Sequence, residues 1–280
     1  MRIIDLKSSV RIEDEDFFDI SQTFDCGQTF RFDKVSENTV FGIAHKRALT
    51  LSQEDGAITL DCTLDEFESI WRRYLALDID YKKINSFFTS GDDEVLKNAA
   101  IYGKGIRILR QDPWEALCSF IISQNNNIPR IKKIINALSE RYGEPIEKDG
   151  RVFYSFPSAE ALALAGTDAI FELRTGFRAK YISDAAEKVA SGEIDLDSIA
   201  SLPTAEALSE LMKIKGVGPK VASCALLFGF DKPDAFPIDV WVRKVFAKYY
   251  PNGFDITSFG NNAGIAQQYL FYYERWNSKS

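Results

Sequence analysis

The chain has 280 residues, 45% of them hydrophobic, and a formal net charge of −7 at pH 7. No hydrophobic run reaches the roughly 18 to 20 residues that span a bilayer, and the N-terminus lacks the apolar core of a signal peptide. We therefore expect a soluble monomer without membrane contact that lies inside the cell, in the cytoplasm if the source is a prokaryote. The length allows two domains.

The charge is unevenly distributed along the chain. Residues 1–100 hold 12 Lys and Arg against 20 Asp and Glu, whereas residues 101–280 hold 22 against 21. The second part can therefore present a basic face to an anionic partner such as nucleic acid, despite the acidic total.

The cysteines and the histidine argue against several kinds of site. The four cysteines, at positions 26, 62, 118 and 224, form no C-x2-C pair, which disfavours a zinc ribbon or an iron–sulfur cluster. The single histidine, His45, disfavours a mechanism that needs two. It falls in a predicted hairpin, where a surface or sheet role is expected. The residues imply no catalytic metal and no organic cofactor.

The first hundred residues predict mainly antiparallel sheet. Strand-like composition covers residues 39–44, 48–51 and 57–60, and the Asp55-Gly56 dipeptide is typical of a tight turn. Residues 63–66 (Thr-Leu-Asp-Glu) have capping-box form and predict a helix that continues to about residue 75.

After about residue 100 the pattern becomes helical. Residues 112–115 (Asp-Pro-Trp-Glu) predict a helix N-terminus, and apolar residues at helical spacing over 131–138 predict the next helix, which Gly143 can end. A further helix is predicted from Thr204 to Lys213. The sequence therefore predicts an α+β fold, with a sheet-rich domain over residues 1–100 and a mostly α-helical domain over residues 101–280.

The most informative stretch covers residues 211–222. A helix ends there, a Gly216-Val217-Gly218 turn follows, and Pro219 begins a new helix. Such glycines allow unusual backbone conformations and let backbone N–H groups approach a phosphate at the positive end of the second helix. This arrangement holds nucleic acid without reading its sequence. The alternative is a tight helical turn with a surface lysine.

This stretch resembles the helix–hairpin–helix of the DNA glycosylase superfamily, although Ile214-Lys215 replaces the usual Leu-Pro. Lys220 and Asp239 match the lysine and aspartate of the bifunctional members. The resemblance implies that Lys220 attacks C1′ of deoxyribose and forms a Schiff base, and that Asp239 stabilises positive charge on the sugar or relays protons. The alternatives are a solvated Lys220 and an Asp239 that only caps the next helix.

Two segments resemble the base-reading parts of the 8-oxoguanine DNA glycosylases. Residues 26–32 (CGQTFRF) imply that the Gly27 carbonyl accepts a hydrogen bond from N7–H, which only the oxidised base has. Residues 263–271 (AGIAQQYLF) imply that Gln267 reads the Watson–Crick edge of a flipped base and that Phe271 stacks on it. Cys224 matches the cysteine that contacts the other face of the base. The alternatives are ordinary core packing and, for Gly27, a simple turn.

Two more segments of the same family imply contacts with the rest of the duplex. Residues 123–130 (SQNNNIPR) imply that Asn125 enters the gap left by the flipped base and that Arg130 reads the orphaned cytosine; the alternative is that Asn127 only caps the following helix. Residues 176–181 (GFRAKY) imply that Phe177 wedges into the base stack and that Arg178 contacts the cytosine.

The hairpin and its surroundings carry two further implications of the resemblance. Trp241 departs from the family, which commonly has a phosphate-binding histidine there; tryptophan donates one hydrogen bond but carries no charge. The backbone carbonyls of Met212, Ile214 and Val217 match positions that hold a monovalent cation in the family.

The resemblance implies a bifunctional 8-oxoguanine DNA glycosylase and apurinic-site lyase that acts on damaged duplex DNA, with its active site in the cleft between the two domains. One rival is a glycosylase for alkylated or other damaged bases, which should not need Gly27 and Gln267. The other is a non-catalytic helix–hairpin–helix DNA-binding protein, which should not need Lys220.

Overall fold

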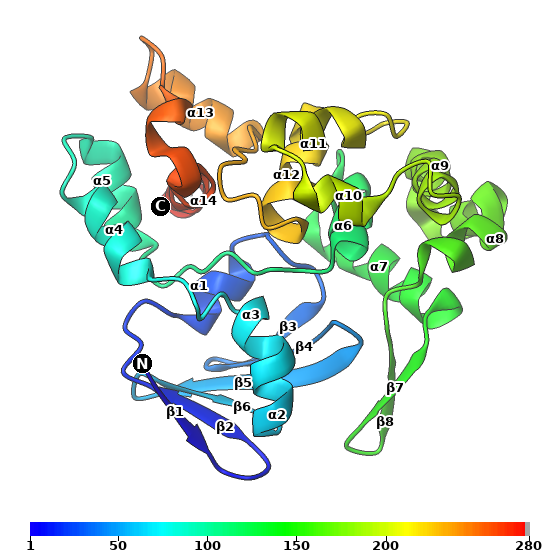
Figure 1. The fold of residues 1–280 in the computed structure, drawn as a ribbon, viewed down its shortest axis with the longest axis horizontal. Helices are drawn as coiled ribbons and strands as arrows, with labels where there is room; N and C mark the ends of the chain where they lie inside the picture. The colour runs from blue at the N-terminus through cyan, green and yellow to red at the C-terminus, as the bar shows by residue number, and fades with distance from the viewer. Residues whose placement is uncertain (278–280) are drawn as a thin grey trace.

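The computed structural model describes residues 1–277 and begins with a six-stranded antiparallel sheet (Figure 1). The strands follow the order β1-β2-β6-β5-β4-β3, so the N-terminal hairpin pairs with the last strand of this sheet. Their bounds are β1 Arg2–Asp5, β2 Val10–Glu13, β3 Phe32–Ser36, β4 Thr39–Ala44, β5 Arg47–Glu54 and β6 Ala57–Leu60.

Local sequence signals explain the centre of this sheet. Side chains in β4 alternate between buried and half-buried, as expected for a strand with one face on a core. Asp55 and Gly56 both have positive φ, at 50° and 78°, which is the conformation of a tight hairpin turn. The predicted strands are therefore confirmed, and His45 lies in the turn between β4 and β5.

One face of the sheet is covered by a helical segment that α2 (Leu64–Glu66), a π-helical turn η1 (Phe67–Trp71) and α3 (Arg72–Tyr74) form together (Figure 1). The Thr63 side chain accepts a hydrogen bond from the Glu66 backbone, as the capping box predicts. Apolar and aromatic side chains of this segment, together with those of α1 (Ile20–Asp25) and the sheet, form one hydrophobic core.

The largest core belongs to the helices that follow. It contains α6 and α12, and the predicted caps Asp112 of α6 and Asn127 of α7 both accept backbone hydrogen bonds. A hairpin of β7 (Pro145–Lys148) and β8 (Arg151–Tyr154), which the sequence did not reveal, extends from it (Figure 1). The helical elements are α6 Pro113–Ser123, α7 Ile128–Tyr142, α8 Ala159–Ile170, η2 Phe171–Thr175, η3 Gly176–Arg178, α9 Ala179–Ala190, α10 Leu196–Ser201, α11 Thr204–Leu211 and α12 Pro219–Gly229.

A third core joins helices from the first part of the chain to the C-terminal helices. Helices α4 (Tyr81–Thr89) and α5 (Glu94–Tyr102) pack with α13 (Val240–Tyr249), η4 (Ile256–Asn262) and α14 (Ala263–Asn277), and Figure 1 shows α4 and α5 beside α14. The domain boundary expected at residue 100 passes through this group, because the apolar faces that hold it together lie far apart in the sequence. The site described below lies between the second and the third of these cores, because its lining includes Phe120 and Cys224 of the second and Cys26 of the third.

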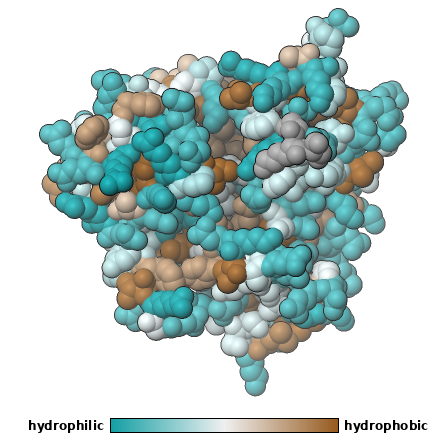
Figure 2. Space-filling view, turned by 180° about the vertical axis from the view of Figure 1, so that it is seen from behind, coloured by the Kyte–Doolittle hydropathy of each residue, from teal (hydrophilic) through white to brown (hydrophobic). Residues whose placement is uncertain are grey.

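The surface agrees with the composition. No helix of the described residues is long and apolar enough to cross a membrane. The face in Figure 2 is mostly hydrophilic, with hydrophobic residues in separate patches. All four cysteines are buried and free, and residues 1–277 contain no group of His, Cys, Asp and Glu side chains that could hold a metal ion.

Candidate active site and DNA-binding surface

The turn between α11 and α12 is a tight hairpin with one obligatory glycine. Gly216 has a φ of +79°, and a Cβ at this position would lie 2.5 Å from the Tyr181 ring. Gly218 precedes Pro219 with extended backbone, and a Cβ there would meet nothing within 4 Å. Gly216 is therefore needed for packing against Tyr181. At Gly218, the backbone is accessible from the surface of the protein. Helix α11 ends at Leu211, two residues before the predicted end, because the backbone tightens into this turn.

Lys220 lies in the first turn of α12 and is half-buried. Its Nζ lies 3.5 Å from the Ser123 hydroxyl oxygen and 5.7 Å from the centre of the Phe120 ring. Asp239 caps α13, since its carboxylate accepts hydrogen bonds from the backbone of Trp241 and Val242. The cap predicted for Asp239 is confirmed, and Asp239 also lines the same cavity as Lys220.

The electrostatics of Asp239 reflect this position. Burial raises the pKa of its carboxyl, while the hydrogen bonds from Val242 and Trp241 and the charge of Lys220 act in the opposite direction. Lys220 and Asp239 form no direct ion pair in the described part of the chain. Lys220 and Asp239 therefore line one cavity without a direct ion pair, although the charge of Lys220 acts on the carboxyl.

This cavity has a volume of about 220 Å³ and brings together distant parts of the sequence. All six residues expected to perform the chemistry or read the base line it: Gly27, Lys220, Cys224, Asp239, Gln267 and Phe271. They come from the loop after α1, from α12, from the start of α13 and from α14. The fold thus brings into one pocket four segments that are far apart in the sequence.

Gln267 holds an unsatisfied polar group in this pocket. Its side chain is 3% exposed, and its Oε1 is buried without a hydrogen-bond partner among residues 1–277. An unpaired buried acceptor costs about 1–3 kcal/mol. A ligand with a hydrogen-bond donor would recover this free energy, and the N1–H and N2–H groups of guanine are such donors.

Cys224 contributes a neutral thiol to the same wall. Burial raises its pKa to about 11, although the ammonium of Lys220 acts to lower it. The thiol is therefore protonated at neutral pH, which suits contact with a base and not nucleophilic attack.

A wider groove of about 1040 Å³ adjoins the pocket and is lined by Asn125, Phe177 and Gly218. Ser123, Lys220, Asp239 and Trp241 line both spaces. Asn125 has a φ of 46°, and Phe177 is 46% exposed. Four of the residues expected to touch the duplex, Asn125, Phe177, Gly218 and Trp241, therefore line the groove beside the pocket that holds the predicted nucleophile.

Arg178 is buried, and its guanidinium serves the protein itself in this structure. It donates hydrogen bonds to the backbone carbonyls of Gln124, Asn125 and Thr175, and it lies 4.4 Å from the centre of the Phe177 ring. The arginine thus holds both the Asn125 loop and the aromatic ring. Its expected contact with the cytosine stays a prediction.

Three further expectations also stay predictions. Arg130 is exposed, and its guanidinium donates to the Arg174 carbonyl. Trp241 lies in the first turn of α13, and the Lys244 ammonium lies 4.2 Å from the centre of its ring. The Met212, Ile214 and Val217 carbonyls are neutral oxygen ligands suited to a monovalent cation, although the Ile214 carbonyl already accepts a hydrogen bond from the Val217 backbone.

Gln268 and Arg275 are among the pocket residues that could not be named from the sequence. Gln268 is 2% exposed, and its amide bonds to the Cys26 carbonyl at 2.8 Å. The sequence feature that could have indicated Gln268 is its position beside Gln267 in an otherwise apolar part of the helix.

The fold and the site define a helix–hairpin–helix base-excision glycosylase, and comparisons with known proteins agree. Residues 9–117 match the family model of the 8-oxoguanine DNA glycosylase N-terminal domain, and residues 118–256 match that of the HhH-GPD superfamily base excision DNA repair proteins. The chain therefore belongs to the 8-oxoguanine DNA glycosylase family.

Individual relatives support this assignment. The chain is 32% identical to a Saccharomyces cerevisiae N-glycosylase/DNA lyase over 82% of its own length and 68% of the relative. A crystal structure of the Clostridium acetobutylicum 8-oxoguanine glycosylase/lyase, bound to DNA with cytosine opposite 8-oxoguanine, is 38% identical with a TM-score of 0.93 over 99% of both chains. A 3-methyladenine DNA glycosylase from Archaeoglobus fulgidus, 24% identical with a TM-score of 0.73, shares the fold.

Proposed function

We propose that this protein removes 8-oxoguanine from duplex DNA opposite cytosine and then cleaves the strand, with Lys220 as the nucleophile. One observation carries the proposal: Lys220 lines the same pocket as Gln267, whose amide oxygen is buried without a hydrogen-bond partner among residues 1–277. Gln267, expected to read the base, and Lys220, expected to attack the sugar, thus line the same pocket. The names of the relatives that the chain resembles support the same activity.

The first step breaks the glycosidic bond. The neutral amine of Lys220 forms a bond to C1′ as the bond from C1′ to N9 breaks, and the base leaves with a proton in place of that bond. Positive charge develops on the sugar during this step. The Asp239 carboxylate, fixed by its two cap hydrogen bonds, stabilises that charge without having to reorganise.

The second step cleaves the strand. The sugar ring opens when the C1′–O4′ bond breaks, which leaves a Schiff base between C1′ and Lys220. Loss of a proton from C2′ then expels the 3′ phosphate by β-elimination. Water hydrolyses the Schiff base and returns the free amine.

Recognition of the base divides between two walls of the pocket. The Gly27 carbonyl accepts a hydrogen bond from N7–H of the oxidised base, whereas N7 of guanine would repel it as a second acceptor. Gln267 pairs with the Watson–Crick edge, and Phe271 and Cys224 lie against the two faces. Outside the pocket, Asn125, Arg130, Phe177 and Arg178 replace the flipped base and hold the orphaned cytosine.

The hairpin binds the DNA backbone. Open backbone at Gly218, next to the positive end of α12, suits a phosphate contact. We further propose that the protein acts inside the cell as a monomer; residues of one chain supply every group expected to act on the base, which suits a monomer.

The test is covalent trapping. Incubation with borohydride and a duplex that holds one 8-oxoguanine opposite cytosine should yield a stable protein–DNA adduct, and Lys220→Gln should abolish it. Lys213→Gln is the matched control, because the Lys213 ammonium pairs with the Glu210 carboxylate on the surface and does not line the pocket. A duplex with 3-methyladenine should give no adduct. Trapping that survives Lys220→Gln, or that is equal on both lesions, would overturn the proposal.

A further inference from the structure

The loop that carries Gly27 is held by side chains on both sides of that residue. The Asp25 carbonyl accepts from Arg275 at 3.2 Å, the Cys26 carbonyl from Gln268 at 2.8 Å, and the Gln28 carbonyl from Gln111 at 2.7 Å. No hydrogen bond among residues 1–277 ends on the Gly27 carbonyl. The carbonyls of the two residues before Gly27 and of the residue after it are thus occupied, whereas the carbonyl of Gly27, which lines the pocket, is free among residues 1–277.

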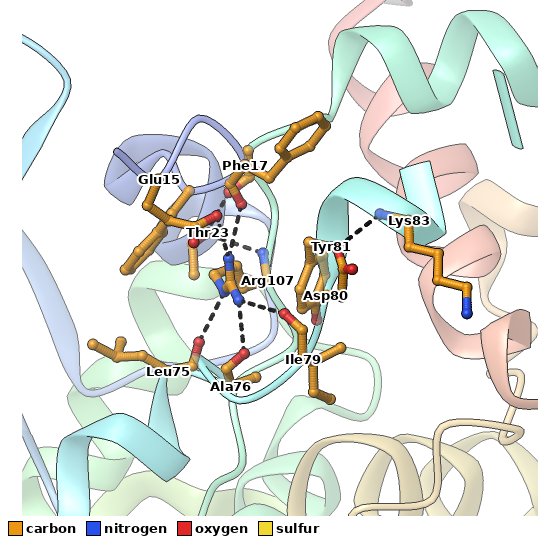
Figure 3. Close-up of polar contacts among 12 residues, drawn as sticks. Glu15, Phe17, Thr23, Leu75, Ala76, Ile79, Asp80, Tyr81, Lys83 and Arg107 are labelled. Atoms are coloured by element: carbon orange, nitrogen blue, oxygen red, sulfur yellow. Dashed lines mark hydrogen bonds and ion pairs between the residues drawn. The ribbon is translucent and has the colours of Figure 1, made fainter. Parts of the chain in front are cut away.

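The side of the loop after Gly27 rests on a rigid support. The buried Gln28 side chain accepts from the Leu109 backbone at 2.8 Å and donates to the Arg107 carbonyl at 2.7 Å. Arg107 is itself fully buried. Figure 3 shows its guanidinium bonded to Glu15 and to the carbonyls of Phe17, Leu75, Ala76 and Ile79. The segment that holds Gln28 is therefore fixed by a dense polar network.

The side of the loop before Gly27 depends on α14. Gln268 fixes the Cys26 carbonyl, which belongs to the same peptide plane as the Gly27 N–H. Gly27 has a φ of +79°, a conformation in which glycine is free to rotate toward several alternatives. Fixing this peptide plane limits that freedom and sets the direction of the next carbonyl. The neighbour of Gln268, Gln267, carries the unpartnered amide oxygen that faces the base.

From these contacts we propose that Gln268 is a positioning residue for base selection. It ties the Gly27 carbonyl to the helix that carries Gln267, so that the acceptor for N7–H and the reader of the Watson–Crick edge keep a fixed separation. The inference rests on the proposed function, because it concerns how 8-oxoguanine is distinguished from guanine. Gln268 contacts the loop and takes no part in the attack on the sugar.

The test removes the donor and keeps the shape. In Gln268→Met, the side chain has the same length and no amide, so the Cys26 carbonyl loses its partner. The expected single-turnover rate of 8-oxoguanine excision falls at least about tenfold, the range of one lost buried hydrogen bond, whereas cleavage at a preformed abasic site opposite cytosine stays within about twofold. A preformed abasic site has no base for Gly27 to read.

A binding measurement separates positioning from general damage. In a Lys220→Gln background, the ratio of affinities for 8-oxoguanine and guanine duplexes should fall at least about tenfold with Gln268→Met. Gln53→Met is the matched control, because Gln53 also donates to a backbone carbonyl, that of Phe18, but belongs to β5 and does not line the pocket. The control should leave the ratio unchanged.

Three outcomes would overturn the inference: an unchanged affinity ratio, equal losses of excision and abasic-site cleavage, or the same ratio change in the control. If Gln268→Met does not fold, Gln268→Asn retains the amide but shortens the side chain by one methylene, and the same pattern is expected. Failure of the proposed function is distinguishable, because the unmodified protein would then not excise 8-oxoguanine at all.

Discussion

Gln267 and Lys220 line one cavity of about 220 Å³ although they lie on different helices, and the amide oxygen of Gln267 is buried without a hydrogen-bond partner among residues 1–277. Helix α12 places the amine at its first turn, and α14 places the amide at its second. This relationship joins recognition to chemistry, and the predictions below test each part of it.

Gln267→Met should make the protein more stable and less active. The substitution removes an acceptor that is buried without a partner, so the free energy of unfolding should rise by about 1 kcal/mol. Excision of 8-oxoguanine should fall by at least about tenfold, because the Watson–Crick edge loses its partner. Chemical denaturation and single-turnover excision measure the two effects. A destabilised variant with normal excision would contradict this account of the pocket.

Asp239→Asn should lower the excision rate and raise the stability of the protein by an amount that depends on pH. Burial raises the pKa of Asp239 in the folded protein, so the folded state binds the proton more tightly than the unfolded state. The unmodified protein therefore loses stability as the pH rises from the unfolded pKa, about 3.9, through the folded one. Asparagine caps helices equally well and does not ionise.

The variant should accordingly be more stable than the unmodified protein at pH 7, and the difference should vanish below about pH 3.9. Its excision rate should fall by about 10²-fold or more, since the carboxylate that stabilises the sugar cation is gone. Denaturation curves at several pH values test the sign. If the stability difference between the variant and the unmodified protein grew toward acidic pH, the predicted direction of the pH dependence would be wrong.

The two hairpin glycines should respond differently to alanine. Gly216→Ala places a methyl 2.5 Å from the Tyr181 ring at a positive φ, so it should cost about 1–3 kcal/mol of stability. Gly218→Ala meets nothing within 4 Å and should leave stability unchanged, while its methyl hinders the approach of a phosphate and weakens DNA binding. Thermal melts and DNA affinity distinguish the pair; equal melting temperatures would argue against the packing described for Gly216.

Arg178→Met should loosen the Asn125 loop. The backbone carbonyls of Gln124, Asn125 and Thr175 lose their donor, which should cost about 1–3 kcal/mol of stability and reduce the preference for cytosine opposite the lesion. Lys180→Met, on the exposed side of α9, is the control and should behave like the unmodified protein. Excision opposite each of the four bases measures the preference, and an unchanged preference would assign Arg178 a purely structural role.

Local signals predicted much of the fold and the pocket. Capping residues such as Thr63 and Asp112, and the alternation over residues 39–44, act through neighbours in the sequence and were confirmed. The pocket residues could be named because short motifs carry them. The hydrogen bonds of Gln268 and Arg178 to distant backbone carbonyls could not be predicted, because a backbone carbonyl has no signature in the sequence. The packing of α4 and α5 on α14 was hidden because it joins apolar faces that lie far apart in the sequence.

The central claim is that Lys220 forms the covalent bond to DNA. The most direct measurement is peptide mapping by mass spectrometry of the complex reduced with borohydride on an 8-oxoguanine duplex. We predict that the mass of the reduced sugar adduct is found on the peptide that contains Lys220, and on Lys220 itself after fragmentation. An adduct on another lysine or on the N-terminal amine, with Lys220 unmodified, would contradict the account.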